Sequence, residues 1–129
     1  MNIAIGYRKD AVSDDILKLA TEHARAFNGR VYILMSLKGK GDKSAEFESA
    51  ESQMRSVKEY FEQHGVECVE MLLDRGLLPG EDIVRFSEEN KIDEIIIGVV
   101  KISKVGKLLM GSTAQYVILH APCPVIAVK

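Results

Sequence analysis

The chain of 129 residues lacks the features that mark several classes of protein. Its two cysteines, Cys68 and Cys123, form no CxxC motif and have no metal-ligand spacing to a histidine, which argues against a disulfide scaffold or a zinc module. We expect both thiols to be buried and reduced. The net charge of −2 provides no overall basic field for nucleic acid or an anionic membrane. No apolar run approaches the roughly 18 residues of a membrane span, and the N-terminus lacks the layout of a signal peptide, so we expect a cytoplasmic protein.

What the chain does contain is a regular alternation of apolar runs and helical periodicity. Runs suited to buried strands cover 2–7, 31–37, 66–73, 92–97 and 123–128. Four amphipathic segments lie between them: one begins after Ser13 and ends at Asn28-Gly29, one runs from Ser44 to His64, and the others begin at Pro79 and Gly111. This order predicts an α/β fold, a parallel five-stranded sheet with helices on both faces. Without a linker or a repeat, residues 1–129 form one domain.

The most informative stretch runs from Ile95 to Val128. An apolar run stops at Gly98, and Gly111-Ser112-Thr113 opens the last helix before a final strand. A helix start offers unpaired backbone N–H groups and the positive end of the helix dipole, and here also two hydroxyls, all of which suit a phosphate. The connecting loop carries three lysines, Lys101, Lys104 and Lys107.

This stretch resembles the nucleotide-binding signature of the universal stress protein (UspA-like) family, which reads Gly, two residues, Gly, nine residues, then Gly-Ser/Thr. Gly98 and Gly111-Ser112 take the first and last positions with the spacing intact, and Lys101 stands where the second glycine belongs. The resemblance covers nearly the whole chain. It implies a Rossmann-like sheet in the order 3-2-1-4-5 and a ligand in the crevice at the carboxyl ends of strands one and four.

The resemblance also implies which residues bind. ATP would lie across the crevice, with Mg²⁺ as its accompanying cation. Gly98 would let the backbone pass close to the ribose and phosphates, and Gly111, Ser112 and Thr113 would donate to phosphate oxygens. Lys101 adds a positive charge within reach of a phosphate. Backbone near Leu37 would meet the adenine.

One family position departs from the pattern. The family places an aspartate at the end of strand one, whereas this chain has Gly6, Tyr7 and Arg8. Tyr7 or Arg8 would stack on a base or contact phosphate in its place. A purely structural interpretation also remains open. Tyr7 and Arg8 would then be ordinary strand-end residues, Gly98 would end a strand, and Ser112 would cap a helix.

Catalytic residues are not predicted. No Ser-His-Asp or Cys-His-Asp arrangement can be assembled, and His23 falls on the apolar face of its helix, where a core histidine is expected. At most, we expect these residues to support slow ATP hydrolysis. The last strand, Pro124 to Val128, is expected at a sheet edge, and the family pairs this strand in a homodimer. The alternative is that Pro122 and Pro124 protect the edge.

Taken together, the sequence predicts a homodimeric, nucleotide-binding universal stress protein that acts as a regulatory module in a stress response. Two alternatives remain: a dimeric scaffold of the same fold that binds no nucleotide, and a weak ATPase. Lys101 and the missing acid on strand one favour the scaffold.

Overall fold

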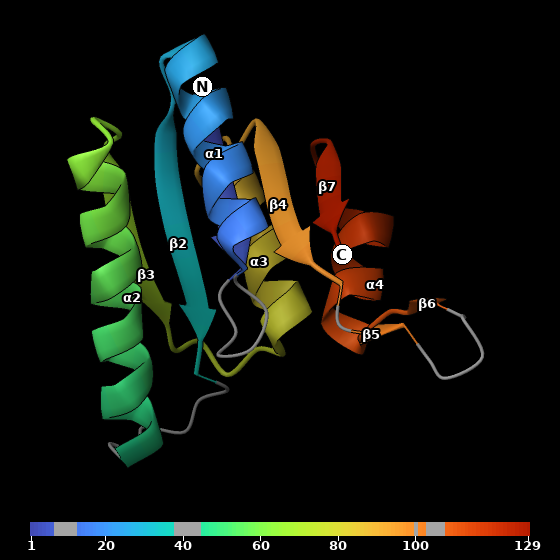
Figure 1. Ribbon diagram of the computed structural model, residues 1–129. Coiled ribbons are helices and arrows are strands. Elements are labelled where there is room, and N and C mark those ends of the chain that lie inside the picture. The colour runs from blue at the N-terminus through green and yellow to red at the C-terminus, as the bar shows by residue number, and fades with distance from the viewer. Residues whose placement is uncertain (7–12, 38–44, 100, 103–107) are drawn as a thin grey trace.

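The computed structural model describes residues 1–6, 13–37, 45–99, 101–102 and 108–129 (Figure 1). Five parallel strands form the sheet in the order β3-β2-β1-β4-β7. They are β1 (Asn2–Gly6), β2 (Arg30–Ser36), β3 (Cys68–Leu73), β4 (Glu94–Gly98) and β7 (Val125–Val128). The helices of the described chain are α1 (Asp14–Phe27), α2 (Ala45–Gln63), α3 (Pro79–Glu89) and α4 (Ser112–His120). The predicted fold class and strand order are confirmed.

A small antiparallel hairpin was not predicted. β5 (Lys101–Ile102) pairs with β6 (Leu108–Leu109) between β4 and α4. Strands of two residues are too short to show the alternation that identifies a strand in a sequence. Residues 101–102 and 108–109, expected to belong to a plain loop, are therefore paired as strands.

The predicted helix signals are confirmed where the structure describes them. The Ser13 side chain accepts a hydrogen bond from the Ile16 backbone N–H at the start of α1, and Asn28 ends that helix in the left-handed conformation. Pro79 occupies the first turn of α3. Strand boundaries shift by up to two residues, and β4 starts at Glu94 rather than Ile92 because the Ile92 N–H still donates to the Ser87 carbonyl of α3.

The sheet is buried on both faces, as a parallel sheet requires. Figure 1 shows α1 and α2 on one face and α3 and α4 on the other. Alternation along β1 divides its side chains between the two layers, because Ile3 and Ile5 belong to the core under α1 and α2, whereas Ala4 belongs to the core under α3 and α4. All three are fully buried. In the described part of the chain, no helix has the length and apolar character to cross a membrane.

Close approach of α3 and α4 depends on a glycine. A Cβ placed on Gly80, in the first turn of α3, would lie 3.0 Å from the Tyr116 Cβ and 3.2 Å from its ring atoms on α4. These two helices share one core cluster. The side chain of any other residue at position 80 would therefore push the two helices apart.

The two cysteines are free, as expected, and differ in burial. Cys68 on β3 is buried and Cys123 is half-buried. Burial raises the pKa of the Cys68 thiol to about 12. Burial, and then the charges of Asp93 and Glu94, raise the pKa of the Cys123 thiol. Both are therefore thiols rather than thiolates at neutral pH.

We expect the Gly80→Ala variant to be destabilised. Overpacking at a tight contact costs about 1–3 kcal/mol, and the better helix propensity of alanine recovers only about 0.5–1 kcal/mol of it. Urea denaturation measures the free energy of unfolding. In the double variant Gly80→Ala/Tyr116→Ala, the ring contacts are gone and only the Cβ contact remains, so the double variant should lose less free energy of unfolding than the two single variants together. A Gly80→Ala protein as stable as the wild type would contradict the packing argument.

We expect the two thiols to react at different rates with a thiol reagent at pH 8. Cys68 should react only when the protein unfolds, because burial both shields it and keeps it protonated. Cys123 should react slowly in the folded protein and faster as the pH rises toward its raised pKa. The Cys123→Ser variant isolates the signal of Cys68. Native Cys68 reacting as fast as a free thiol would show that β3 opens readily.

Candidate functional site

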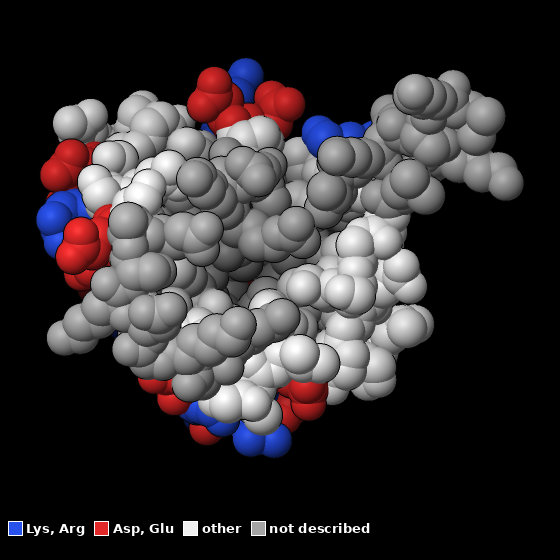
Figure 2. All heavy atoms as spheres, turned by 90° about the horizontal axis from the view of Figure 1, so that it is seen from below, with Lys and Arg blue, Asp and Glu red and all other residues white. Residues whose placement is uncertain are grey.

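The sheet has its topological switch point between β1 and β4. β1 lies between β2 and β4, and the chain extends the sheet in opposite directions from these two central strands. Crevices for ligands form in open α/β sheets at the carboxyl ends of such strands. Figure 2 views this end of the sheet along the strands.

Both central strands end in glycine. β1 ends at Gly6 and β4 ends at Gly98, which pairs with Val128 of β7. A Cβ on Gly6 would lie 3.0 Å from the Ile83 Cδ1 and 3.6 Å from the Ile97 Cγ2. The first turn of α3 thus packs closely beside the end of β1, and the backbone rather than a side chain forms this part of the edge.

The start of α4 is open to an anion. Gly111 is the N-cap residue, with φ −65° and ψ 160°, and among the described residues no side chain caps the helix. Its first turn contains no acidic residue, whereas the first turns of α1 and α3 contain Asp14 and Asp15, and Glu81 and Asp82. Ser112 is exposed and Thr113 is half-buried. Uncapped N–H groups and a positive dipole end without a competing carboxylate suit a phosphate.

The β5–β6 hairpin brings two positions of the glycine signature close together. Lys101 pairs with Leu109 in the β5–β6 ladder, two residues before Gly111. This pairing brings the second and third signature positions close together in space. The backbone of Lys101 lies in this ladder; its side chain, and the predicted contacts of Tyr7, Arg8, Lys104 and Lys107, lie outside the described residues.

Leu37 lies at the same edge, directly after β2. Its backbone N–H donates to the Leu73 carbonyl at 2.8 Å and extends the β2–β3 ladder by one step. Within the described part of the chain, its carbonyl has no hydrogen-bond partner. The Leu37 N–H is therefore occupied within the sheet.

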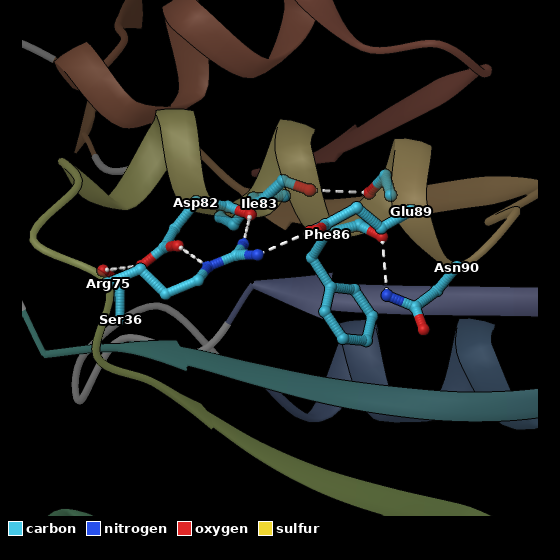
Figure 3. Close-up of polar contacts among 8 residues, drawn as sticks. Ser36, Arg75, Asp82, Ile83, Phe86, Glu89 and Asn90 are labelled. Carbon is cyan, nitrogen blue, oxygen red and sulfur yellow. Dashed lines mark hydrogen bonds and ion pairs between the residues drawn. The ribbon is translucent and has the colours of Figure 1, made fainter.

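A buried polar network lies next to Leu37, and no pattern in the sequence predicts it. Figure 3 shows Ser36 and Arg75 pointing toward Asp82. The Ser36 hydroxyl donates to Asp82 Oδ2 at 2.7 Å, and Arg75 Nε donates to Asp82 Oδ1 at 2.9 Å. Asp82 is fully buried. An acid in the first turn of a helix is typical and matches the helix dipole, but neither the burial of Asp82 nor its partner Arg75 follows from spacing along the chain.

Arg75 extends the network to the far end of α3. It donates to the Asp82 carbonyl at 3.2 Å and forms an ion pair with Glu89. The hydrogen bonds to Glu89 and Asp82 raise the pKa of the Arg75 guanidinium, against the lowering effect of its partial burial. The loop between β3 and α3 is therefore fixed to the helix that follows it.

The described histidines lie away from this edge or bond locally. His23 Nδ1 is 2.7 Å from Glu94 Oε1. Glu94 begins β4, so this pair lies at the amino ends of the strands, opposite the candidate site. The His23 side chain is 29% exposed. The His64 and His120 rings bond to carbonyls of their own helices. Among the described residues, no cluster of histidine, cysteine and acidic side chains could hold a metal ion.

Comparison with known proteins agrees with this architecture. The sequence model of the universal stress protein family matches residues 1–129. A universal stress protein of Methanocaldococcus jannaschii is 30% identical over 130 residues, which cover 92% of this chain and 75% of that protein.

Two solved structures are also similar over the full chain. The universal stress protein from Archaeoglobus fulgidus is 38% identical with a TM-score of 0.88, covering 100% of this chain and 98% of that one. A structure of the universal stress protein from Archaeoglobus fulgidus in complex with dAMP is 34% identical with a TM-score of 0.81 and the same coverage. Sheet order, glycine signature and similarity over the full length agree, and the chain belongs to the universal stress protein family.

Proposed function

We propose that this protein binds ATP or a related adenine nucleotide at the carboxyl ends of β1 and β4 and acts as a cytoplasmic regulatory module in a stress response. The observation that carries the proposal is the open start of α4, at the edge where Gly98 ends β4. The similar structure with bound dAMP supports an adenine nucleotide as the ligand.

The proposed roles follow from position. Gly111, Ser112 and Thr113 donate to phosphate oxygens, and Gly98 lets the backbone approach the ribose and phosphates. Lys101 supplies positive charge, where a glycine would supply backbone flexibility. Leu37 offers its carbonyl to the base. Mg²⁺, where it accompanies ATP, is bound by the phosphates, since these residues provide no carboxylate for it.

We expect little hydrolysis of the bound ATP. A water molecule that attacks a phosphate needs a base or an orienting group, and the buried acid of α3, Asp82, already accepts hydrogen bonds on both oxygens. We therefore propose binding without efficient hydrolysis, with slow ATP hydrolysis as the limit.

We further propose a homodimer through β7. The Pro124 and Val128 carbonyls accept hydrogen bonds from the Ile95 and Val99 N–H groups of β4. Because backbone groups alternate in direction along a strand, Val125 and Ala127 direct theirs toward the open edge. Nearby on α4, Ile118 is 42% exposed and Leu119 is 77% exposed. An unpaired edge beside exposed apolar side chains favours pairing with a second copy.

The second candidate function is a dimeric scaffold that binds no nucleotide. Two features favour it: Lys101 replaces the second signature glycine, and no acid occupies the positions from Gly6 to Arg8. The two candidates differ in a single measurable property, the affinity for ATP.

Calorimetry on protein stripped of nucleotide tests the binding proposal. We expect a dissociation constant for ATP on the order of micromolar. In Gly111→Val the affinity should fall at least about tenfold, since a branched side chain crowds the phosphate site. The fold should persist, because the backbone angles of Gly111 suit any residue. Ser56→Ala, on the exposed side of α2, is the matched control and should bind as the wild type does. No binding at millimolar ATP would reject the proposal in favour of the scaffold.

Light scattering on the eluting protein tests the dimer. Ala127→Pro removes an N–H that faces the open edge and leaves the ladder to β4 intact. We expect this variant to elute as a monomer and to stay folded by circular dichroism. Ala127→Ser keeps the N–H and should remain a dimer. A monomeric wild type, or a dimeric Ala127→Pro protein, would exclude pairing through β7.

A further inference from the structure

The proposed nucleotide site and the proposed dimer edge share two elements, α4 and β7, which lie together at one end of the sheet (Figure 1). α4 begins beside Gly111, where we place the phosphates, and near its other end it exposes Leu119. The Val128 carbonyl, at the end of β7, accepts a hydrogen bond at 2.8 Å from the N–H of Val99, the residue after Gly98. The two surfaces are thus joined through one helix and one hydrogen-bonded strand pair.

Few buried side chains hold α4 in place. It has 9 residues and buries two of them, Ala114 and Val117, whereas α3 has 11 residues and buries six. A segment with few buried contacts opens or shifts at a lower free-energy cost than one with many. The position of α4 therefore responds to whatever binds at either end of it.

A ring contact makes α4 move as one unit. Tyr116, in the middle of the helix, packs on Gly80 of α3 and stacks on the His120 ring, with 4.1 Å between the ring centroids. His120 is the last residue of α4. A phosphate at the start of the helix and a partner beside its last turn consequently act on the same rigid element.

The two open edges of the sheet differ in a way that favours β7 as the edge that pairs. At the other edge, charged side chains lie around Cys68 of β3, namely Lys58, Glu62 and Glu70. Charged side chains along an edge strand oppose pairing with another chain. β7 consists of the apolar residues Val125–Val128. A second copy of this chain is therefore the occupant that fits beside α4.

We propose that nucleotide binding and pairing through β7 are positively coupled, so that a bound nucleotide favours the dimer and the dimer favours nucleotide binding. The inference rests on the proposed nucleotide site and the proposed dimer, and it adds their mutual regulation. Fixing α4 costs conformational entropy once, and the event that comes first leaves less of that cost to the second. Coupling of this kind is reciprocal, so one factor describes both effects.

Reciprocity gives a quantitative test. Calorimetry should show ATP affinity at least about fivefold lower in the monomeric Ala127→Pro variant than in the wild-type dimer. Light scattering over a dilution series gives the dissociation constant of the wild-type dimer. Saturating ATP fills both protomers, so this constant should fall by the square of the same factor, roughly twenty-fivefold or more. Ala127→Ser should match the wild type in both measurements.

Inorganic tripolyphosphate tests whether the coupling runs through α4. It has no base or ribose, so it can occupy the start of α4 without reaching the end of β2. We expect tripolyphosphate to strengthen the dimer in the same direction as ATP. A dimer that responds to ATP and not to tripolyphosphate would exclude the start of α4 as the route.

A double variant at the far end of α4 provides a second readout. Ile118→Ser/Leu119→Ser alters side chains roughly 10 Å along the helix axis from Ser112. It should weaken the dimer and, at concentrations where it is monomeric, lower ATP affinity as Ala127→Pro does. Leu72→Ser is the matched control, because Leu72 is 39% exposed on β3, at the opposite edge, and Ile118 is 42% exposed. The control should change neither property.

Two results would overturn the coupling while leaving both underlying proposals intact. One is a dimer that binds ATP and yet has the same dissociation constant with and without it. The other is a monomeric Ala127→Pro protein with the ATP affinity of the wild type. A wild type that binds no ATP would instead reject the nucleotide site, and a monomeric wild type would reject the dimer; the coupling falls with either.

Discussion

Burial of the sheet on both faces is the constraint on which the rest of this structure depends. β1 shows it most clearly, because Ile3, Ala4 and Ile5 are fully buried and yet serve two separate cores. A strand that is buried on both faces has no side chain exposed to contact a ligand. The polar groups that remain available are those at the ends of the strands, where the sheet meets loops and helix termini. A ligand site in this fold is therefore expected at the ends of the strands.

That edge has two halves with different physical character. On the β4 side, small residues and an uncapped helix expose backbone N–H groups, and the attraction is electrostatic. On the β2 side, Ser36, Asp82 and Arg75 hold the backbone in place through buried hydrogen bonds. The first half is where our proposal places the phosphates of a nucleotide.

Much of this could be predicted from the sequence, and the reasons are local. Apolar runs, the Ser13 cap, the Asn28 terminus and Pro79 each act through neighbouring residues, so the strands and helices follow from short patterns. The glycine signature indicated Gly98 and Gly111 because both lie at element ends. The β5–β6 hairpin escaped detection because its strands have two residues each. The pairing of Asp82 with Ser36 spans 46 positions, and no period or motif links positions that far apart.

The hairpin has a consequence for the spacing within the glycine signature. Because Lys101 is bonded opposite Leu109, the distance in space between the second and third signature positions is set by a pair of short strands. A spacing of nine residues along the chain is thus bridged by one paired step in space, and a substitution that unpairs β5 from β6 would separate the two signature positions.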